Sequence, residues 1–597
     1  MDLKLSTHTA TDAEVAAIDT VLGPADSSWH GLDRQVDDPR LDRHTARGGH
    51  ALRDIRHRLL PTLHAVNDRV GWISRGAINH IALRLDVAPA EIYGVATFYG
   101  LFSTTERAAR QVHVCVDLAC QLAGATVPEG AHESPCLGLC ERAPAALLID
   151  AGDTPTQAVI APATPVSVRA ALDGFVEAEA EVIAATPQCP SPALTLLGRV
   201  GVVDPTSLDS YRAHGGYAAL TKALAMGPDA VVAEVNASGL LGRGGAAFPA
   251  GRKWAAVAGQ PARPHYLVCN ADESEPGTFK DRVIMEGDPF ALVEAITIAG
   301  IATGCEQGYL YLRGEYPRAK DHMRSAVAQA EAAGLLGDDV MGSGHAFHLE
   351  VFLGAGAYIC GEETAIFNSI EGYRGEPRNK PPFPVEVGLF GKPTLVNNVE
   401  TLVNVLPIIV GGGDAYAALG TSGSSGTKLF CLSGSVARPG IYEVEFGATL
   451  RELIHLGGGV TPGRTLRAVL LGGAAGTFAT VDELDVPLTF EDTRPAGLSL
   501  GSGVIMVLDD TADLVAYVQR IAAFFRDESC GQCVPCRVGT VRQEELLHRL
   551  GAGSSIDDER ALMLDIGRVM RDASICGLGQ TAHNAIESAI VKLGVLS

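Results

Sequence analysis

Residues 265–282 read HYLVCNADESEPGTFKDR, an apolar run followed at once by a polar, glycine-containing one. The first five letters predict a strand, and α/β proteins place their ligand loops directly after such strands. The carboxylates of the polar run can accept hydrogen bonds from ribose hydroxyls or from a flavin's ring N–H groups. A solvated polar loop is the simpler alternative. The stretch predicts an α/β fold with a ligand loop, whose candidate residues are Asn270, Asp272, Glu273 and Glu275.

Glycine-rich loops lie on both sides of this stretch. LGRGGAAFPAGRKW, residues 241–254, combines glycines that let the backbone approach a phosphate or a flat ring with basic residues that add charge for phosphates. GAGAYICGEE, residues 354–363, follows the strand-like HLEVFL and does not complete the usual G-x-G-x-x-G. A tight turn is the alternative for either loop. The candidates are Gly242, Arg243, Gly244, Gly245, Arg252, Lys253, Gly361, Glu362 and Glu363.

Two further stretches are weaker signals. RNKPPFP, residues 378–384, is a proline-stiffened turn that offers Phe383 as a stacking face. PTLVNNVETL, residues 393–402, presents the amides Asn397 and Asn398 between apolar flanks. Standing alone, these would be an ordinary turn and a helix cap.

Near the C-terminus, ESCGQCVPC places Cys530, Cys533 and Cys536 at two-residue gaps. This spacing puts three thiolates on one tight turn, as iron–sulfur clusters require, and the fourth ligand then comes from elsewhere. Cys576 is the only other cysteine after residue 536. We therefore assign these four to one [4Fe–4S] cluster. A four-thiolate zinc site is the alternative, although zinc sites more often pair two C-x2-C knuckles.

A second set has the spacing C-x4-C-x15-C-x3-C and comprises Cys115, Cys120, Cys136 and Cys140. Four thiolates suit a [2Fe–2S] cluster or zinc, and the spacing alone does not decide between them. One electron-carrying cluster in a chain makes another more useful, which favours iron.

Composition excludes several function classes. The chain has 597 residues, enough for several domains, and a net charge of −23 from 47 basic and 70 acidic residues. Such acidity argues against nucleic-acid binding. The N-terminus lacks the apolar region of a secretory signal, and no window offers the roughly twenty apolar residues of a membrane span. We expect a soluble cytoplasmic protein whose thirteen cysteines serve metal binding or redox chemistry.

The motifs GRGGAAFPAGRKW, NADESEPGTFKDR, GAGAYICGEE, KPPFP, NNVET and ESCGQCVPC together resemble the NADH-oxidising flavoprotein subunit of respiratory complex I. The chain looks like a fusion in which that subunit comes after the smaller iron–sulfur subunit that pairs with it, over roughly residues 55–595. Complex I normally keeps the two as separate chains. A single chain resembles the diaphorase subunits of NAD-linked formate dehydrogenases and NAD-reducing hydrogenases.

The resemblance implies two bound nucleotides. FMN would be held by Gly242, Arg243, Gly244, Lys253, Asn270, Asp272, Tyr358, Gly361, Glu362, Asn397 and Asn398. NAD(H) would stack on the flavin near Gly245, Phe248, Lys253, Glu275, Glu363 and Phe383. Glu362 or Glu363 would act in catalysis by disfavouring a second negative charge on the flavin. Glu275 would disfavour a 2′-phosphate and so favour NAD over NADP.

The resemblance also implies a multidomain architecture of α/β and α+β parts. A thioredoxin-like domain would carry the [2Fe–2S] cluster, a Rossmann-like domain the FMN, and a four-helix bundle the [4Fe–4S] cluster. The expected order is an N-terminal arm (1–47), a helical bundle (48–108), the thioredoxin-like domain (109–180), a linker (181–196), the FMN and NAD domain (197–425), a ubiquitin-like β-grasp domain (426–510) and the C-terminal helical domain (511–597).

In function, we expect a diaphorase that passes electrons from a partner through iron–sulfur clusters to FMN and on to NAD+, reversibly. We favour a molybdenum or tungsten formate dehydrogenase alpha subunit as the partner, within a larger hetero-oligomer. Hydrogenase subunits and complex I are the alternatives. A structural zinc protein and a nucleotide sensor are rival hypotheses from other function classes. A brown colour of the purified protein would exclude the zinc protein, and ferricyanide reduction by NADH would distinguish an enzyme from a sensor.

Two positions depart from the family pattern. Ala247 stands where the motif GRGGAGF has its last glycine. The fifteen residues between Cys120 and Cys136 are fewer than usual, so a helix and a strand of the thioredoxin-like fold are expected to be missing.

Overall fold

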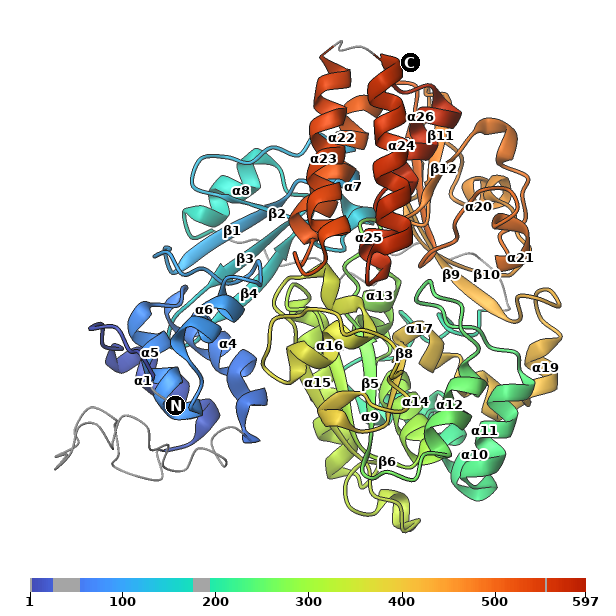
Figure 1. Ribbon diagram of the computed structural model, residues 1–597. Helices are drawn as coiled ribbons and strands as arrows, with labels where there is room; N and C mark the ends of the chain where they lie inside the picture. The colour runs from blue at the N-terminus through green and yellow to red at the C-terminus, as the bar shows by residue number, and fades with distance from the viewer. Residues whose placement is uncertain (1–2, 25–53, 176–193, 553–555, 597) are drawn as a thin grey trace.

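The computed structural model describes residues 3–24, 54–175, 194–552 and 556–596. Most of the expected linker over 181–196 therefore lies outside the described residues, as does the arm from residue 25 onward. Within the described ranges, three sheets and the helices around them are arranged as in Figure 1. No helix in these ranges is long and apolar enough to cross a membrane.

The N-terminal part is helical. Helix α1 begins with a capping box between Thr11 and Glu14, and it buries Ala17 and Ile18 against the next helices. The sequence suggested only a loose or partner-binding arm here. This was wrong for residues 12–22, because two apolar side chains and a good cap suffice to dock a short helix on an existing bundle. The bundle comprises α1 (Asp12–Leu22), α4 (Leu59–Val70), α5 (Arg75–Leu85) and α6 (Pro89–Ala96).

A mixed four-stranded sheet follows, in the order β2-β1-β3-β4. Strand β2 pairs parallel to β1, and the other pairs are antiparallel. The expectation that a strand is missing between Cys120 and Cys136 was wrong, because this short segment contains β2, which pairs with β1; no helix lies between α7 and β2. The elements are β1 (Arg110–Cys115), α7 (Leu118–Leu122), β2 (His132–Ser134), β3 (Ala146–Asp150), β4 (Thr156–Ile160) and α8 (Pro165–Leu172).

The central sheet is wholly parallel, as the alternation of apolar strands and helices predicts. Its order, β7-β6-β5-β8, is the 3-2-1-4 order of doubly wound folds. Strands β6 and β7 lie on one side of β5, and β8 lies on the other side, so the order of the strands reverses between β5 and β8. Open α/β sheets bind ligands at the carboxyl ends of the strands beside such a reversal. The strands are β5 (His265–Ala271), β6 (Cys305–Leu312), β7 (His348–Leu353) and β8 (Thr394–Asn398).

Helices surround this sheet. Helix α14 is buried along its entire length, which explains why its sequence, PFALVEAITIAGIAT, is almost free of polar residues. The helices of this part are α9 (Leu208–Ala213), α10 (Ala218–Met226), α11 (Pro228–Ala237), α12 (Ala250–Ala258), α13 (Lys280–Gly287), α14 (Pro289–Thr303), α15 (Pro317–Ala332), α16 (Glu363–Ile370), α17 (Val399–Val403), α18 (Val405–Gly411) and α19 (Gly413–Ala417).

The third sheet is mixed and has its own hydrophobic core. Its order is β10-β9-β13-β11-β12, with β9 and β13 parallel at the centre. Helix α20 (Leu450–Leu456) contributes buried leucines to that core, and α21 (Phe490–Thr493) lies nearby in Figure 1. The strands are β9 (Thr427–Gly434), β10 (Gly440–Glu445), β11 (Leu466–Leu471), β12 (Thr477–Ala479) and β13 (Val504–Asp509).

The C-terminal part is helical, and its long helices stand side by side at the top of Figure 1. Helix α22 packs on α23 and α26, and it also contacts α7 of the first sheet domain. The elements are α22 (Leu514–Glu528), α23 (Val534–Gly551), α24 (Ile556–Ala573), α25 (Gly577–Thr581) and α26 (Asn584–Leu593).

Candidate active site and cofactor sites

The loops that the sequence singled out meet at the carboxyl edge of the parallel sheet. The loop after β5 begins at Asp272, and the loop after β7 ends at Gly361. The Asn270 side-chain amide donates to the Gly361 carbonyl at 2.8 Å and so ties the two loops together. Strand β8 ends beside them at Asn398. The carboxyl ends of parallel strands lie at the same edge of a sheet, which explains why stretches far apart in sequence form one site.

Asp272 carries an unsatisfied group in this site. Its Oδ2 is buried and has no hydrogen-bond partner among the described residues. Burial raises the pKa of this carboxyl well above its usual value. A Cβ on Gly361 would lie 3.3 Å from the Asp272 carbonyl oxygen and 3.5 Å from Oδ2, so only glycine leaves this space open. Asp272 thus offers a buried hydrogen-bond acceptor without a partner, and Gly361 leaves open space beside it. A bound polar ring could occupy that space and donate to the acceptor.

Glu275 reaches across to the third sheet domain. The Tyr358 hydroxyl donates to its Oε2 at 2.5 Å, and the Ala475 backbone N–H donates to its Oε1 at 2.9 Å. Burial raises the pKa of Glu275 to about 7. Near neutral pH this carboxyl is therefore poised between its two charge states.

Glu273 faces away from the site. Its carboxylate accepts from the backbone N–H groups of Asp281 and Arg282 at 2.8 and 2.9 Å, and so caps the start of α13. The Tyr316 hydroxyl donates to it at 3.2 Å. The sequence grouped Glu273 with the ligand-binding carboxylates. Its side chain instead supports the loop, because the free N–H groups of a helix N-terminus compete for any nearby carboxylate.

Arg243 also differs from expectation. Its fully buried guanidinium donates to the Ser425 carbonyl at 2.7 Å and the Tyr416 hydroxyl at 3.1 Å, and lies over the Phe446 ring. The side chain is therefore not open to a phosphate. It fastens the glycine loop to α19, to the segment before β9 and, through the Phe446 ring, to the third sheet domain.

The glycine loop itself lies against β8. A Cβ on Gly244 would lie 3.2 Å from the Asn398 Cβ, a contact tighter than most side chains accept. Gly245 adopts a positive φ of 112°, which favours glycine. The glycines thus serve close approach, as the sequence predicts, with Gly242 completing the turn by donating its N–H to the Phe248 carbonyl at 2.9 Å.

Four charged side chains alternate in sign next to these loops. The Lys380 ammonium lies 2.9 Å from Glu362 and 3.0 Å from Glu363, and the Lys253 ammonium lies 3.5 Å from Glu363. Burial alone would raise the pKa of Glu363, but the two lysines lower it. Glu362 in addition caps α16 by accepting from the Thr364 and Ala365 N–H groups. Lys380 is a member that the sequence analysis missed.

The two aromatic rings expected to stack on a ligand are exposed. Phe248 is 49% exposed and Phe383 is 52% exposed, unusually high values for phenylalanine. The Lys253 ammonium lies 5.8 Å from the centre of the Phe248 ring. The Lys253–Glu363 ion pair therefore lies beside the solvent-exposed ring of Phe248.

The amides of β8 are engaged within the protein. Asn397 accepts from the Trp254 indole N–H at 2.9 Å. Asn398 donates to Asp281 at 2.6 Å and accepts from the Lys280 ammonium at 3.2 Å. Asn398 is thus held by partners on both its oxygen and its nitrogen, whereas for Asn397 only the oxygen is engaged among the described residues.

The first cysteine set converges between β1, α7 and the segment after β2. Cys115, Cys120, Cys136 and Cys140 are all buried, and Cys115 lies within hydrogen-bonding reach of Cys120 and Cys136. The sulfurs of Cys136 and Cys140 are 3.5 Å apart. Two thiolates on one tetrahedral metal, at bonds of about 2.3 Å, lie about 3.8 Å apart. The spacing thus fits a pair of thiolate ligands on one tetrahedral metal, whether iron or zinc.

The second cysteine set lies between the ends of α22, α23 and α25. Cys576 is the N-cap of α25, and a Cβ on Gly579 in that helix would lie 2.9 Å from the Cys536 Cβ. Cys530 and Cys533 are half-buried on the segment before α23. Within the described ranges, no three histidine, cysteine, aspartate or glutamate side chains converge tightly enough for one metal ion. An iron–sulfur cluster binds its four thiolates through several irons, so the four sulfurs need not converge on a single point.

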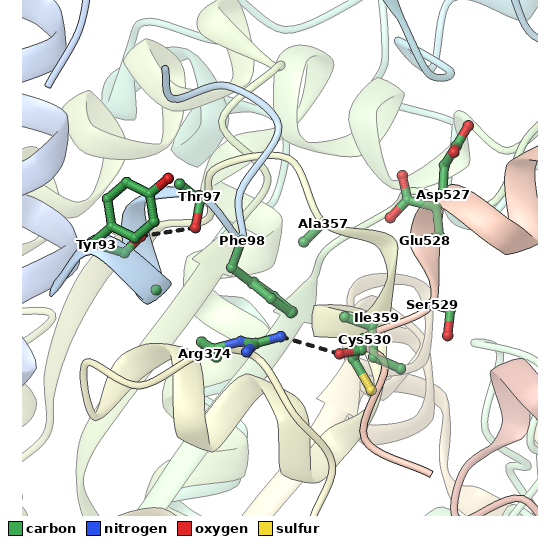
Figure 2. A pocket seen from close by; sticks show the side chains of 11 residues that line it. Tyr93, Thr97, Phe98, Ala357, Ile359, Arg374, Asp527, Glu528, Ser529 and Cys530 are labelled. Carbon is green, nitrogen blue, oxygen red and sulfur yellow. Dashed lines mark hydrogen bonds between the residues drawn. The ribbon is translucent and has the colours of Figure 1, made fainter. Parts of the chain in front are cut away.

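A cavity of about 340 Å³ opens beside Cys530, as Figure 2 shows. It lies where the N-terminal bundle, the loop after β7 and the end of α22 meet, and is lined among others by Tyr93, Phe98, Arg374 and Glu528. Arg374 lies over the Phe98 ring and donates to the Cys530 carbonyl at 3.3 Å. One end of the C-terminal cysteine segment is thus accessible from outside.

Comparison with known proteins identifies each part. Residues 49–128 match the thioredoxin-like [2Fe-2S] ferredoxin family, and residues 235–407 match the Nuo51 FMN-binding domain. Residues 429–476 match the SLBB domain, and residues 516–593 match the NADH-ubiquinone oxidoreductase-F iron-sulfur binding region. In Aquifex aeolicus, the F subunit of NADH-quinone oxidoreductase is 46% identical over 65% of this chain and 89% of its own length.

The chain belongs to the family of these F subunits. The NADP-reducing hydrogenase subunit HndC of Solidesulfovibrio fructosivorans is 44% identical over 65% of this chain and 80% of its own. A chain of NAD+-reducing [NiFe]-hydrogenase superposes with a TM-score of 0.76 at 32% identity, covering 90% of this chain and 92% of its own. The F-subunit part is here fused after the [2Fe–2S] ferredoxin part, as the motifs predicted.

The matched domains decide between the iron–sulfur and zinc alternatives left open by the sequence. The chain is an oxidoreductase with FMN-, [4Fe–4S]- and [2Fe–2S]-binding domains, and the structural zinc protein is excluded. The match to the ferredoxin family ends at residue 128, so it includes Cys115 and Cys120 but not the second cysteine pair. For that pair, the 3.5 Å sulfur separation is the structural argument that it binds a metal.

Residues that sequence reasoning missed lie after β6. Arg313, Glu315 and Tyr316 follow the apolar run GYLYL and stand at the same sheet edge as the other loops. All three are buried. The rule that found the loop after β5 applies equally to YLYLRGEY, but this loop has only one glycine and no amide, so it did not stand out.

Proposed function

We propose that this chain is the NAD(H)-handling diaphorase subunit of an NAD+-reducing hydrogenase. The observation that carries the proposal is the fused architecture: a chain of NAD+-reducing [NiFe]-hydrogenase is covered over 92% of its length, with 90% of this chain included. The F subunits, by contrast, account for 65% of this chain. The matches therefore support a hydrogenase partner better than the formate dehydrogenase expected from the motifs. Complex I remains the second candidate, supported by the identity to its F subunits.

Bound FMN supplies the conversion between a two-electron hydride and single electrons. The residues of this chain bind and orient it in the proposal. Asp272 accepts a hydrogen bond from the flavin ring through its unpartnered Oδ2, and Gly361 leaves room for the ring. Lys253 carries a positive charge to the same edge, held there by Glu363. Asn270 keeps the two loops together.

The nicotinamide nucleotide is proposed to lie over the flavin, against the exposed rings of Phe248 and Phe383. Glu275 faces its ribose, where a carboxylate accepts from hydroxyls and repels a 2′-phosphate. NADH is therefore expected to be preferred to NADPH. Glu362 and Glu363 place negative charge near the flavin, opposed by Lys380, and so disfavour additional negative charge there.

We also infer the finer architecture of the domains. The order β10-β9-β13-β11-β12, numbered from the first strand, is 2-1-5-3-4, the arrangement of a ubiquitin-like β-grasp. The cluster ligands are proposed to be Cys115, Cys120, Cys136 and Cys140 for [2Fe–2S], and Cys530, Cys533, Cys536 and Cys576 for [4Fe–4S]. The complex as a whole is proposed to be cytoplasmic.

Metal analysis of the native complex, isolated through a tag on this chain, tests the proposal. Nickel together with iron would support the hydrogenase. Molybdenum or tungsten would instead identify a formate dehydrogenase, and copurifying membrane subunits without these metals would identify complex I. The chain itself should contribute roughly six irons, four from one cluster and two from the other. A matched sample of the Cys533→Ser variant should lose iron selectively from the [4Fe–4S] cluster.

A further inference from the structure

One buried guanidinium touches two of the cofactor-binding loops. Arg313, at the carboxyl end of β6, donates from Nη2 to the Cys136 carbonyl at 2.6 Å and from Nη1 to the Glu273 carbonyl at 2.5 Å. Cys136 belongs to the first cysteine set, and Glu273 lies next to Asp272 in the flavin loop. Arg313 thus joins the [2Fe–2S] loop to the flavin loop through one rigid fork.

The surroundings of Arg313 keep its charge close to both loops. The side chain is 2% exposed, and its counter-ion is Glu315, also buried, at 2.7 Å. Only one oxygen of Glu315 is engaged, because its Oε2 has no partner among the described residues. In a buried environment charges are weakly screened, so both ions act strongly on any redox group nearby.

Neighbouring residues fix the same junction. Arg282 donates to the Gly138 carbonyl at 2.9 Å and pairs with the buried Glu141 at 2.5 Å. Tyr316 packs so tightly against Gly138 that a Cβ there would lie 2.0 Å from its hydroxyl. These contacts hold the cysteine loop closely against Arg282 and Tyr316.

We propose that Arg313 is a positioning residue that holds the [2Fe–2S] loop against the flavin loop and raises the reduction potential of the [2Fe–2S] cluster. Reduction adds negative charge to a cluster, so a nearby positive charge stabilises the reduced form. Glu315 acts in the opposite direction. The pair therefore sets the potential through the balance of two buried charges, as outer-shell partners do at metal sites. The inference rests on the proposed ligand set.

Redox titration of the purified complex, followed by the EPR signal of the [2Fe–2S] cluster, tests this. Arg313→Gln should lower the reduced-to-oxidised ratio at the wild-type midpoint at least tenfold, a shift of 59 mV for one electron. Glu315→Gln should raise that ratio at least tenfold. Arg313→Lys keeps the charge and should change it less than threefold. Arg199→Lys, which disturbs a guanidinium paired with Asp288 elsewhere in the same domain, is the matched control and should change nothing.

Opposite shifts for Arg313→Gln and Glu315→Gln separate an electrostatic role from a merely structural one. Shifts of the same sign, or ratios within threefold of wild type in both, would overturn the inference. If Arg313→Gln fails to retain the cluster, Glu315→Gln alone decides it, since a ratio that does not rise overturns the proposal. A wild-type complex without any [2Fe–2S] signal would overturn the cofactor assignment itself, a result distinct from an unshifted signal.

Discussion

At the scale of single residues, Ala247 stands where the family motif has a glycine, and this difference affects the stability of the folded protein. Its φ is 54°, in the left-handed region that an alanine side chain disfavours by about 1 kcal/mol. Ala247→Gly removes that strain. It also increases the chain entropy lost on folding, and this entropic cost is slightly smaller than the strain energy. We expect Ala247→Gly to leave stability unchanged or to raise it by up to about 1 kcal/mol. Ala247→Val, with a branched side chain, should destabilise by more than about 1 kcal/mol.

Thermal unfolding of the cofactor-loaded protein measures both Ala247 variants. Ala246→Gly is the matched control, because Ala246 has no positive φ. It adds the entropic cost without relieving strain and should lower the unfolding midpoint. If Ala247→Gly lowers the midpoint as much as the control does, the strain at residue 247 is not significant.

The carboxyl of Glu275 makes stability depend on pH. Its pKa is about 7 in the folded protein, against an ordinary value of 4.5. For an acid whose folded pKa is raised, the favourable contribution is complete below pH 4.5 and is lost as the pH rises toward 7. The loss is about 3 kcal/mol at most, at about 1.4 kcal/mol per pKa unit. Glu275→Gln retains hydrogen-bonding groups for Tyr358 and Ala475 without this titration.

We therefore expect Glu275→Gln to gain stability relative to wild type as the pH rises from 5 to 8. Unfolding midpoints of the two proteins at both pH values give the comparison. Glu331→Gln, at an exposed position near the end of α15, is the control and should show the same difference at each pH. A Glu275→Gln difference that is equal at pH 5 and pH 8 contradicts the assignment of a raised pKa.

At the scale of elements, Glu400 in α17 connects two domains through buried charges. It accepts from Lys280 of α13 at 3.1 Å, from Lys428 of β9 at 3.3 Å and from the Leu429 N–H at 2.8 Å. Glu400→Gln leaves Lys280 paired with Asp281 and, among the described residues, leaves the buried Lys428 without an ion-pair partner. Breaking a buried ion pair from one side typically costs 3–5 kcal/mol, and we expect about that loss here.

Denaturant unfolding measures this loss, and a double variant provides its control. Glu400→Gln with Lys428→Met removes one cation together with the anion and should recover part of the stability. Lys428→Met alone leaves Glu400 with Lys280 and should cost less than Glu400→Gln. A cost below about 1 kcal/mol for Glu400→Gln would show that the network is solvated rather than buried.

Sequence reasoning was most successful where a periodic element ends in an unusual loop. The strand before Asn270 and the triple cysteine motif both combine a regular pattern with rare spacing, and both led to the right domains. It failed where competition within the fold decides what a side chain binds. Glu273 and Arg243 have suitable chemistry for a ligand, but a helix N-terminus engages Glu273, and α19 with the segment before β9 engages Arg243. The partners of Arg243 lie far from it in the sequence and leave no local trace there.

At the scale of the whole molecule, the ferredoxin part is fastened to the flavin part at several places. Backbone N–H groups of Gly100 and Leu101 donate to the loop after β7 at 2.9 and 3.0 Å. Tyr99 donates to Ser369 at 2.7 Å inside the flavin domain. Asp117, next to the first cysteine pair, binds Arg520 of α22 at 2.7 Å. The contacts thus involve both the FMN-binding domain and the C-terminal helices.

These contacts predict that the covalent connection is dispensable once the protein has folded. We expect a chain cut at a protease site inserted between residues 175 and 194 to elute as one species in size-exclusion chromatography. Buried pairs such as Arg282–Glu141 hold the parts together, since separating them would leave unpaired charges. Glu141→Arg, which places two guanidiniums face to face, should let the cut pieces separate. Separate elution without this substitution would mean that the connection, rather than the interface, keeps the two redox parts in register.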